Sequence, residues 1–498
     1  MTPFLRRRLR RQSSPPKMTS PVSTGNPGEP VPPLPRGSRV PVAIIVISRD
    51  GEEFLAECLD SVFGQTVTPD EIVFVNDASK DGTLAIAELY RERGLKIFNR
   101  EVPGGMNVAR MSGLALTSAP LLLFVDGDNV LPSDYLAAMA AEIGDLDFVY
   151  PGKRFIGSPE ALSWSRQWHP RDEWTPDEAS RARLWEANQC DTCSLMRRDT
   201  FIRAGGWRDN PADNMSDWDL FLRMSRAGRF ARSSARLLYR LHENNWSLRD
   251  RGKDRAAVFG QVRREAATLT VATMWSGRRA ELAMRWIAAV EAALWEAGKR
   301  AELLIMDDSA KGFHLPAVSR DVFPWVNHRR VRRGNVGTEE RRPDRRATAE
   351  FLSGICNEIL DSARGDVVWF VEDDIIPPVH AADILLYELL GSPDAPLAAV
   401  GGAYRSRHPG QEHWLAADYA GGQVEHWRNL PARPTPAPLT GTGCLMVLRD
   451  ALAGTRFALE WQHDGRRSPA HDWAFSWELS RKGSPVMLIP DVVCEHVA

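Results

Sequence analysis

Two similar stretches decide the fold of this chain: LLLFVDGDNVLP at residues 121–132 and VVWFVEDDIIPP at residues 367–378. Each is a short apolar run that ends abruptly in acidic residues and resumes before a proline. A continuous apolar run of this length is typical of a strand that is buried on both faces of a parallel sheet. The sequence therefore predicts a buried strand that runs into a carboxylate cluster, and predicts it twice.

Strand and helix patterns alternate around both stretches. In the first half, VPVAIIVIS predicts a strand, and FLAECLDSVF then carries apolar residues at helical spacing. A further strand, acidic turn and helix follow in EIVFVNDASKDGTLAIAELY, and the second half restarts the pattern with LTVATMW and AELLIMDDS. Strands that alternate with helices form parallel, doubly wound sheets, so we expect an α/β fold.

The landmarks of the first half recur in the same order in the second half, which indicates an internal duplication. The matched pairs are Asp77 with Asp308, Asp126 with Glu372, Asp128 with Asp374, Cys193 with Cys444, Asp217 with Asp472, and His242 with His496.

A chain of 498 residues is too long for one ordinary core, so we expect two domains. We predict a disordered, basic and proline-rich tail at 1–38, a first domain at 39–250, a charged linker at 251–266 and a second domain at 267–498. The tail has arginines but no apolar core or cleavage site, so we do not interpret it as a secretory signal.

Composition narrows the class of protein. The net charge of -2 gives no reason to expect a nucleic-acid partner, and no apolar run approaches the length of a transmembrane segment. We expect a cytoplasmic protein, at most peripheral at a membrane. Six cysteines do not form a disulfide framework in a chain this long, and CDTC at 190–193 has no second pair at zinc-ligand spacing. We interpret the cysteines as buried structural thiols.

The acidic residues follow predicted strands, and parallel sheets bind ligands beyond the carboxyl ends of their strands. A pair of carboxylates spaced as in DGD can hold a hard divalent cation that also needs phosphate partners. Such a cation, Mn²⁺ or Mg²⁺, acts as a Lewis acid on a departing diphosphate. His242 and His496 each follow a late apolar strand, where an imidazole can complete the metal shell.

With these landmarks in view, both halves resemble the family 2 glycosyltransferases, which are inverting enzymes of the GT-A fold that use nucleotide-sugars. The first half carries the resemblance in VNDASKDGT, AGGWRD, SDWDLFLR and YRLHENNWS. The second half carries it in IMDDSAKG, TGTGCLMVLRD, HDWAFSWELSRKG and CEH. The resemblance implies two tandem GT-A domains, that is, Rossmann-like nucleotide-diphospho-sugar transferase domains.

The resemblance also implies a role for each landmark. It implies nucleotide-sugar contacts at Asp77, Asp126, Asp308 and Glu372, metal ligands at Asp128, His242, Asp374 and His496, and general bases at Asp217 and Asp472. The second half departs from the family pattern at Glu372, one methylene longer than the usual Asp. Ser216 and His471 stand before the two bases, where the family more often has Glu.

Several other residues have two readings each. Arg110 either contacts the nucleotide phosphates or forms a surface salt bridge. Trp218 and Trp473, directly after the two bases, either stack on an acceptor sugar or pack in the core. Asp219 has Ala474 as its counterpart, which favours a supporting role. The basic stretch at 327–346 is either a solvated loop or a phosphate-binding insertion.

Taken together, the sequence predicts a metal-dependent glycosyltransferase that transfers sugars, from a UDP-sugar or related donor, to a glycan, lipid-linked or protein acceptor. Two sites would act in sequence. In a second reading, one half is a glycan-binding pseudoenzyme. A third reading is a nucleotidyltransferase, for which Arg278 and Arg279 leave room but the Gly-rich phosphate loop is poorly matched.

Overall fold

The computed structural model describes residues 34–167, 169, 171–176, 180–208, 215–226, 228–243, 245, 255–275, 280–309, 314–331, 345–392, 395–406, 413–420, 423–459, 461–463, 466–468 and 470–497. The expected tail thus lies outside the described residues except for residues 34–38. Residues 332–344 of the basic stretch, and Arg278 and Arg279, also lie outside them.

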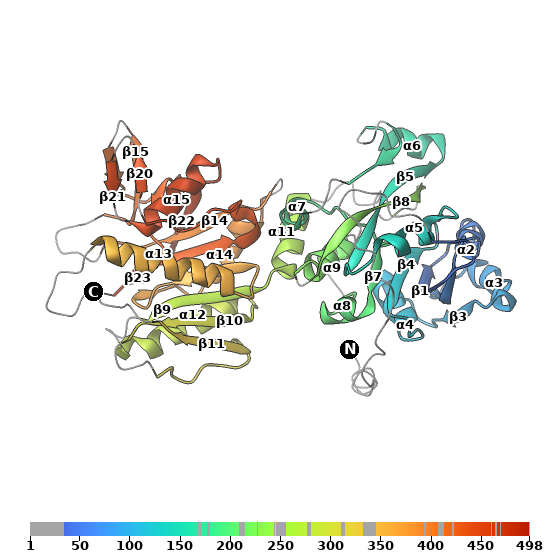
Figure 1. Cartoon of the computed structure of the whole chain (residues 1–498), viewed down its shortest axis with the longest axis horizontal. Helices are drawn as coiled ribbons and strands as arrows, with labels where there is room; N and C mark the ends of the chain where they lie inside the picture. The colour runs from blue at the N-terminus through green and yellow to red at the C-terminus, as the bar shows by residue number, and fades with distance from the viewer. Residues whose placement is uncertain are drawn as a thin grey trace.

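The first half is built on an eight-stranded sheet with helices against it (Figure 1). Its strands are β1 (Arg39–Ser48), β2 (Thr68–Asn76), β3 (Lys96–Asn99), β4 (Leu121–Asp126), β5 (Phe148–Gly157), β6 (Glu173–Trp174), β7 (Leu195–Arg197) and β8 (Phe230–Leu241). Its helices are α2 (Leu55–Phe63), α3 (Thr83–Glu88), α4 (Gly105–Leu114), α5 (Tyr135–Glu142), α6 (Pro159–Ser165), α7 (Arg181–Glu186), α8 (Arg198–Arg203) and α9 (Ser216–Met224).

Strand β1 shows why the apolar runs are continuous. Val42, Ile44 and Val46 belong to one core cluster, and Ile45 and Ile47 belong to another. Successive side chains of a strand point to opposite faces, so a strand covered on both faces needs apolar residues at every position.

The second half contains another eight-stranded sheet and three small ones. The large sheet contains β9 (Leu269–Trp275), β10 (Ala301–Asp307), β11 (Trp325–Arg330), β12 (Val367–Val371), β14 (Ala399–Ala403), β17 (Thr435–Ala437), β19 (Cys444–Leu448) and β22 (Val486–Val493). The small sheets pair β13 (Ile375–Ile376) with β23 (Glu495–His496), β15 (Ala416–Ala420) with β16 (Gln423–His426) and β18 (Leu439–Thr440), and β20 (Trp461–His463) with β21 (Arg466–Ser468). The helices are α11 (Arg255–Ala266), α12 (Ala283–Glu296), α13 (Arg345–Ser362), α14 (Ala381–Leu390) and α15 (His471–Arg481).

The two large sheets share a strand order. The first runs β3-β2-β1-β4-β7-β5 with β8 beside β5, and the second runs β11-β10-β9-β12-β19-β14-β22. The expected parallel pairing holds for β1 to β4 and for β9 to β12. It does not extend across the sheets, because β7 is antiparallel to β4 and β5, and β19 is antiparallel to β12 and β14.

The stretch that we expected to be a linker contains helix α11 at residues 255–266. Val258, Phe259 and Val262 recur at helical spacing among its charged residues and pack into the core. In the same way, residues 327–330 of the basic stretch belong to strand β11 and not to a loop.

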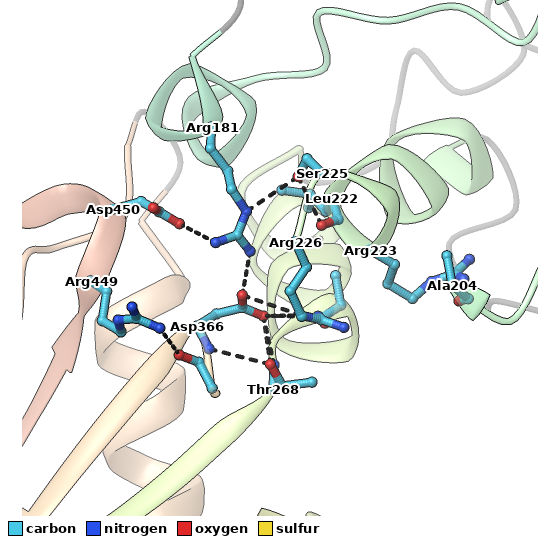
Figure 2. A network of polar contacts seen from close by, with 12 residues as sticks. Arg181, Ala204, Leu222, Arg223, Ser225, Arg226, Thr268, Asp366, Arg449 and Asp450 are labelled. Atoms are coloured by element: carbon cyan, nitrogen blue, oxygen red, sulfur yellow. Dashed lines mark hydrogen bonds and ion pairs between the residues drawn. The ribbon is translucent and has the colours of Figure 1, made fainter. Parts of the chain in front are cut away.

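An ion-pair network ties the two halves together (Figure 2). Asp366, at the start of β12, is 1% exposed and accepts from Arg181 of α7 and from Arg226 just after α9. Arg181 also donates to Asp450 at 2.8 Å, and the Trp185 ring nitrogen donates to the same carboxylate at 3.1 Å. The contact between the halves is therefore built from buried charges as well as apolar side chains.

Within the described part of the chain, every helix is too short or too polar to cross a bilayer. All six cysteines are buried free thiols, as we expected from their spacing.

Candidate active site

The first-half landmarks meet at one edge of the sheet. Strands β1, β2 and β4 are parallel, with Ser48 paired to Asn76 and Ile47 paired to Asp126. Asp77 and Asp126 therefore stand at the carboxyl ends of neighbouring strands, where parallel sheets bind their ligands.

Asp77 is almost fully buried and organises the start of α4. Its Oδ1 accepts from Arg100 Nε at 2.8 Å and from the Gly104 amide at 2.9 Å, and its Oδ2 accepts from the Gly105 amide at 2.9 Å. Gly105 has a φ of 80°, a conformation that favours glycine. Asp77 thus holds the loop that borders the site, while its contact with a nucleobase stays a prediction.

Asp126 is held by Arg110, which is 2% exposed. The Arg110 Nη2 atom donates to Asp126 Oδ1 at 2.7 Å, and the guanidinium lies 4.5 Å from the centre of the Trp207 ring. Burial raises the pKa of Asp126, Arg110 acts against that rise, and Asp128 adds to it. The reading of Arg110 as a surface salt bridge is therefore wrong, because its ion pair is internal.

Asp128 and His242 come together from distant parts of the sequence. The His242 Nε2 atom lies 3.2 Å from Asp128 Oδ2, and the Asn245 side-chain amide lies 3.4 Å from the same oxygen. Their side chains are 28% and 20% exposed, so solvent or a ligand reaches both groups.

The equivalent pair in the second half also comes together. The His496 Nε2 atom lies 3.7 Å from Asp374 Oδ2, and β13 pairs with β23 so that Ile375 stands opposite His496. His496 Nδ1 lies 2.7 Å from the Arg405 carbonyl oxygen, which orients the ring so that Nε2 faces the carboxylate.

These donors fit a hard divalent cation. Each site supplies one carboxylate and one imidazole, a set that Mn²⁺ accepts. Among the described residues no group of three or more His, Cys, Asp and Glu side chains is placed to hold an ion. A cation bound here would complete its shell with water and substrate phosphates, as Mg²⁺ usually does.

Asp217, the predicted base, lies in the first turn of α9. Its Oδ2 accepts from the Asn188 side-chain amide at 2.9 Å, and its Oδ1 accepts from the Trp218 backbone amide at 2.8 Å. Burial raises the pKa of Asp217, and Lys153 partly offsets that rise. A raised pKa suits a general base, because the carboxylate then accepts a proton more readily.

The two neighbours of Asp217 in α9 are structural. Asp219 is 1% exposed and binds both Arg208 and Arg223, in agreement with its expected supporting role. Trp218 is fully buried, donates from its ring nitrogen to the Leu184 carbonyl at 2.6 Å and packs against α11. The prediction that Trp218 stacks on an acceptor sugar is therefore wrong, since helical geometry turns it into the core.

In the second half, Asp472 occupies the first turn of α15, and Asp472 Oδ1 accepts from the Trp473 amide at 2.9 Å. Trp473 is half-buried, with its ring centre 5.6 Å from that of His426, so its acceptor role stays a prediction. Glu372 Oε1 accepts from the Thr442 hydroxyl at 2.9 Å, and burial raises the pKa of Glu372.

Asp308 occupies the backbone position that the match with Asp77 predicts. The Asp77 amide donates to Ser48, the last residue of β1, and the Asp308 amide donates to Trp275, the last residue of β9. Its nucleotide contact also stays a prediction.

Sequence reasoning missed four polar residues of the first site: Arg100, Lys153, Asn188 and Asp191. Arg100 was one arginine among many, Asn188 stood in no motif, and Lys153 looked like an ordinary strand residue. Asp191 lies inside CDTC, a stretch that we interpreted only through its two cysteines. These residues can be assigned to the site only from the structure, where separate strands, helices and loops bring them close together.

Comparison with known proteins places the chain in a family. A family model described as Glycosyl transferase family 2 matches residues 43–205. The PGL/p-HBAD biosynthesis glycosyltransferase of Mycobacterium bovis is 35% identical over 184 residues, which cover 36% of this chain and 68% of that protein. The uncharacterized glycosyltransferase YwdF of Bacillus subtilis is 26% identical, over 45% of this chain and 80% of that protein.

Other similarities cover smaller shares. The uncharacterized glycosyltransferase EpsJ of Bacillus subtilis is 36% identical over 22% of this chain, but only 32% of EpsJ is covered. The crystal structure of S. aureus TarS 1-349 in complex with UDP-GlcNAc is 20% identical, with a TM-score of 0.36, over 45% of this chain and 65% of that one. The chain thus spans less than two thirds of EpsJ and of this TarS fragment. From the family model and the mycobacterial relative, we conclude that the chain belongs to the family 2 glycosyltransferases.

Proposed function

We propose that this protein is a metal-dependent, inverting glycosyltransferase that moves a sugar from a nucleotide-sugar to a hydroxyl acceptor at the site of the first half. The observation that carries the proposal is the 3.2 Å approach of His242 to Asp128. Family membership and the position of Asp126, held by Arg110 at the end of β4, support it.

The reaction forms a bond between the acceptor oxygen and the anomeric carbon, and breaks the bond between that carbon and the diphosphate. Asp217 takes the proton of the acceptor hydroxyl, and the electron pair of the broken bond leaves with the nucleoside diphosphate. General base catalysis of this kind contributes about 10²–10⁴-fold. Attack from the face opposite the leaving group inverts the anomeric configuration.

Asp128 and His242 would hold the cation in the first half, and Asp374 and His496 would hold one in the second. A bound cation supplies positive charge to the departing diphosphate. Asp126, fixed by Arg110, and Asp77, fixed by Arg100, face the donor in this proposal, so their ion pairs orient the carboxylates before the donor binds.

In our first proposal, the second half is a second catalyst that acts in sequence with the first. The short distance between Asp374 and His496 and the position of Asp472 at the start of α15 support this. One transfer would take place in the proposed domain 39–250 and the other in the proposed domain 267–498. The product of one transfer would then be the acceptor of the other.

A specific difference favours the alternative, in which the second half binds glycan without catalysis. Arg100 donates its backbone amide to Asn76 at the end of β2, and Val331 makes the equivalent bond to Asp307 at the end of β10. The arginine that holds Asp77 therefore corresponds to an uncharged valine.

Arg110 has an uncharged counterpart as well. Cys356 stands as far before Glu372 as Arg110 stands before Asp126. Cys356 is buried, and the Glu372 carboxylate adds to the effect of burial in raising its pKa, which places the two groups close together. A diphosphate donor is negatively charged, so it favours a site where cations offset the charge of the carboxylates. Neutral sugar hydroxyls can bind carboxylates whose charge no cation offsets.

The test is a set of single variants assayed with Mn²⁺ against a panel of nucleotide-sugars and acceptors. If the chain holds two catalysts, Asp217→Asn and Asp472→Asn each abolish one transfer and leave the other. If the second half only binds glycan, Asp217→Asn abolishes all transfer, and Asp472→Asn changes only the apparent affinity for acceptor. No turnover of any donor by the unmodified protein would contradict both versions.

A further inference from the structure

A buried ion pair lies beside the proposed base of the first half. The Lys153 Nζ atom, on β5, is 2.6 Å from Asp191 Oδ2, and the two side chains are 18% and 5% exposed. The ammonium group also lies 5.1 Å from the ring centre of Trp174 and 4.8 Å from that of Tyr239. An enclosed cation with a carboxylate and two aromatic rings around it has little freedom to move.

A chain of hydrogen bonds connects this pair to Asp217. The Asn188 side-chain amide donates to Asp217 Oδ2 at 2.9 Å, and its carbonyl oxygen accepts from the Cys190 backbone amide at 3.1 Å. The next residue is Asp191, which binds Lys153. The segment that orients the base on one side is therefore anchored by the lysine on the other.

The charges around Asp217 act in opposite directions. Burial raises its pKa, the Lys153 ammonium lowers it, and the Asp191 carboxylate raises it. The buried thiol of Cys190 also lies close to Asp217, since the Asp217 carboxylate adds to burial in raising the pKa of this thiol. Lys153 is thus the cation that favours the ionised form of the base, and Asp191 is the anion that opposes it.

The second half has a phenol where the first half has this cation. With Cys193 matched to Cys444, the pair Val149–Leu195 corresponds to the pair Val400–Met446. Lys153 on β5 and Tyr404 just after β14 each lie four residues further along the chain from these matched positions. Tyr404 is 4% exposed, and Asp472 is one of the carboxylates that raise its pKa. The phenol therefore lies near the second base, as the ammonium lies near the first.

The residues around Tyr404 have changed with it. The Gly443 amide donates to the Tyr404 hydroxyl at 2.7 Å, and a Cβ atom at Gly441 or Gly443 would overlap the phenol. The counterpart of Asp191 is Thr442, which binds Glu372 instead. A lysine with its carboxylate in one half thus corresponds to a tyrosine with two glycines and a threonine in the other.

We propose that Lys153, anchored by Asp191, is a positioning residue that orients the segment behind Asp217 and supplies the positive charge beside this base. This inference rests on the proposed role of Asp217 as general base. Lys153 acts through Asp217 and needs no contact with substrate.

The experiment measures kcat/KM between pH 5.5 and 9 for a transfer that Asp217→Asn abolishes, in the full-length chain. Lys153→Gln should move the acidic limb of the profile to higher pH, so that its loss of activity is largest at low pH and shrinks as pH rises. Asp191→Asn should move the same limb to lower pH. Lys153→Arg, which keeps the charge, should restore most of the profile.

The matched control is Lys96→Gln, which removes a lysine from an exposed ion pair with Glu71 at 2.9 Å and should leave the profile in place. If Lys153→Gln and Asp191→Asn lower activity equally at all pH values, or shift the limb in the same direction, the inference is overturned. If Lys153→Gln does not fold, the Asp191→Asn and Lys153→Arg profiles still decide it. A protein that turns over no donor contradicts the proposed function itself, which is a separate outcome.

Discussion

His242 Nε2 lies 3.2 Å from Asp128 Oδ2, although 114 positions separate the two residues in the chain. Strand β8 ends just before His242 and runs beside β5, while Asp128 follows β4. An isolated bridge between Val130 and Leu238 joins the segment after β4 to strand β8. The sheet therefore creates the proposed metal site from residues that are remote in sequence.

The first prediction concerns the metal. Mn²⁺ added together with a nucleoside diphosphate should raise the melting temperature, because ligands stabilise the state that they bind. Asp128→Asn and His242→Asn should each reduce that rise strongly. Asp145→Asn is a matched control, because Asp145 is an exposed carboxylate whose only described ion pair is with Arg229. An unchanged rise in both site variants would contradict the assignment.

The second prediction concerns Asp217. Asp217→Asn should lower kcat by about 10²–10⁴-fold while donor binding persists. Because burial raises the pKa of the folded-state carboxyl, its ionisation weakens the fold as pH rises from the ordinary aspartate range through the raised value. Asp217→Asn should therefore be more stable than the unmodified protein at pH 7.5, by an amount that shrinks on acidification.

Denaturant titration at several pH values measures this effect. Asp219→Asn serves as the contrast, because Asp219 is a buried partner of Arg208 and Arg223. It should destabilise the protein at pH 7.5, where Asp217→Asn stabilises it. Destabilisation by both variants would contradict the assignment of different roles to these two aspartates.

The third prediction separates the two tryptophans. Trp218→Phe should destabilise the protein by about 1–3 kcal/mol, because the Leu184 carbonyl loses its buried donor. Its KM for acceptor should not change. Trp473→Phe should change the acceptor KM more than the stability, since Trp473 is only half-buried. A large change in the acceptor KM from Trp218→Phe, with none from Trp473→Phe, would show that Trp218 contacts the acceptor after all.

The fourth prediction concerns the contact between the halves. Asp366→Asn should destabilise the protein by about 3–5 kcal/mol at pH 7, because it leaves two guanidinium groups without their buried carboxylate. Burial opposes the charge of Asp366, but Arg226 and Arg181 outweigh it and lower its pKa. The stability that the ion pairs of Asp366 with Arg181 and Arg226 contribute is present at neutral pH. It is lost as pH falls through the lowered pKa of Asp366.

The difference between Asp366→Asn and the unmodified protein should therefore vanish in acid. Differential scanning calorimetry should also resolve two transitions in the variant if the network couples the halves. A variant with unchanged stability at pH 7 would show that the network contributes nothing measurable. Arg93→Gln, which removes an exposed pair with Asp60, is the control and should have little effect.

The sequence by itself determined the order of strands and helices and the position of acidic residues at strand ends. The spacing and number of apolar residues are local properties of the sequence. Strands β1, β4 and β12 could therefore be recognised without knowledge of the strands beside them. The pairing of Asp128 with His242 was predicted from their positions after apolar strands and from the family resemblance, and the structure brings these residues together. The helix in the expected linker was not predicted, because the charges of this stretch obscure the apolar side of α11.

Only the tertiary structure decided what each charge faces. Arg110 and Trp218 look like surface or substrate groups in the sequence, but packing places both in the interior. The mixed direction of the sheets depends on where the chain re-enters, which no local pattern records. The cation beside Asp217 and its replacement by Tyr404 likewise arise from strands that meet only when folded, because electrostatic effects depend on distance in space and not on position along the chain.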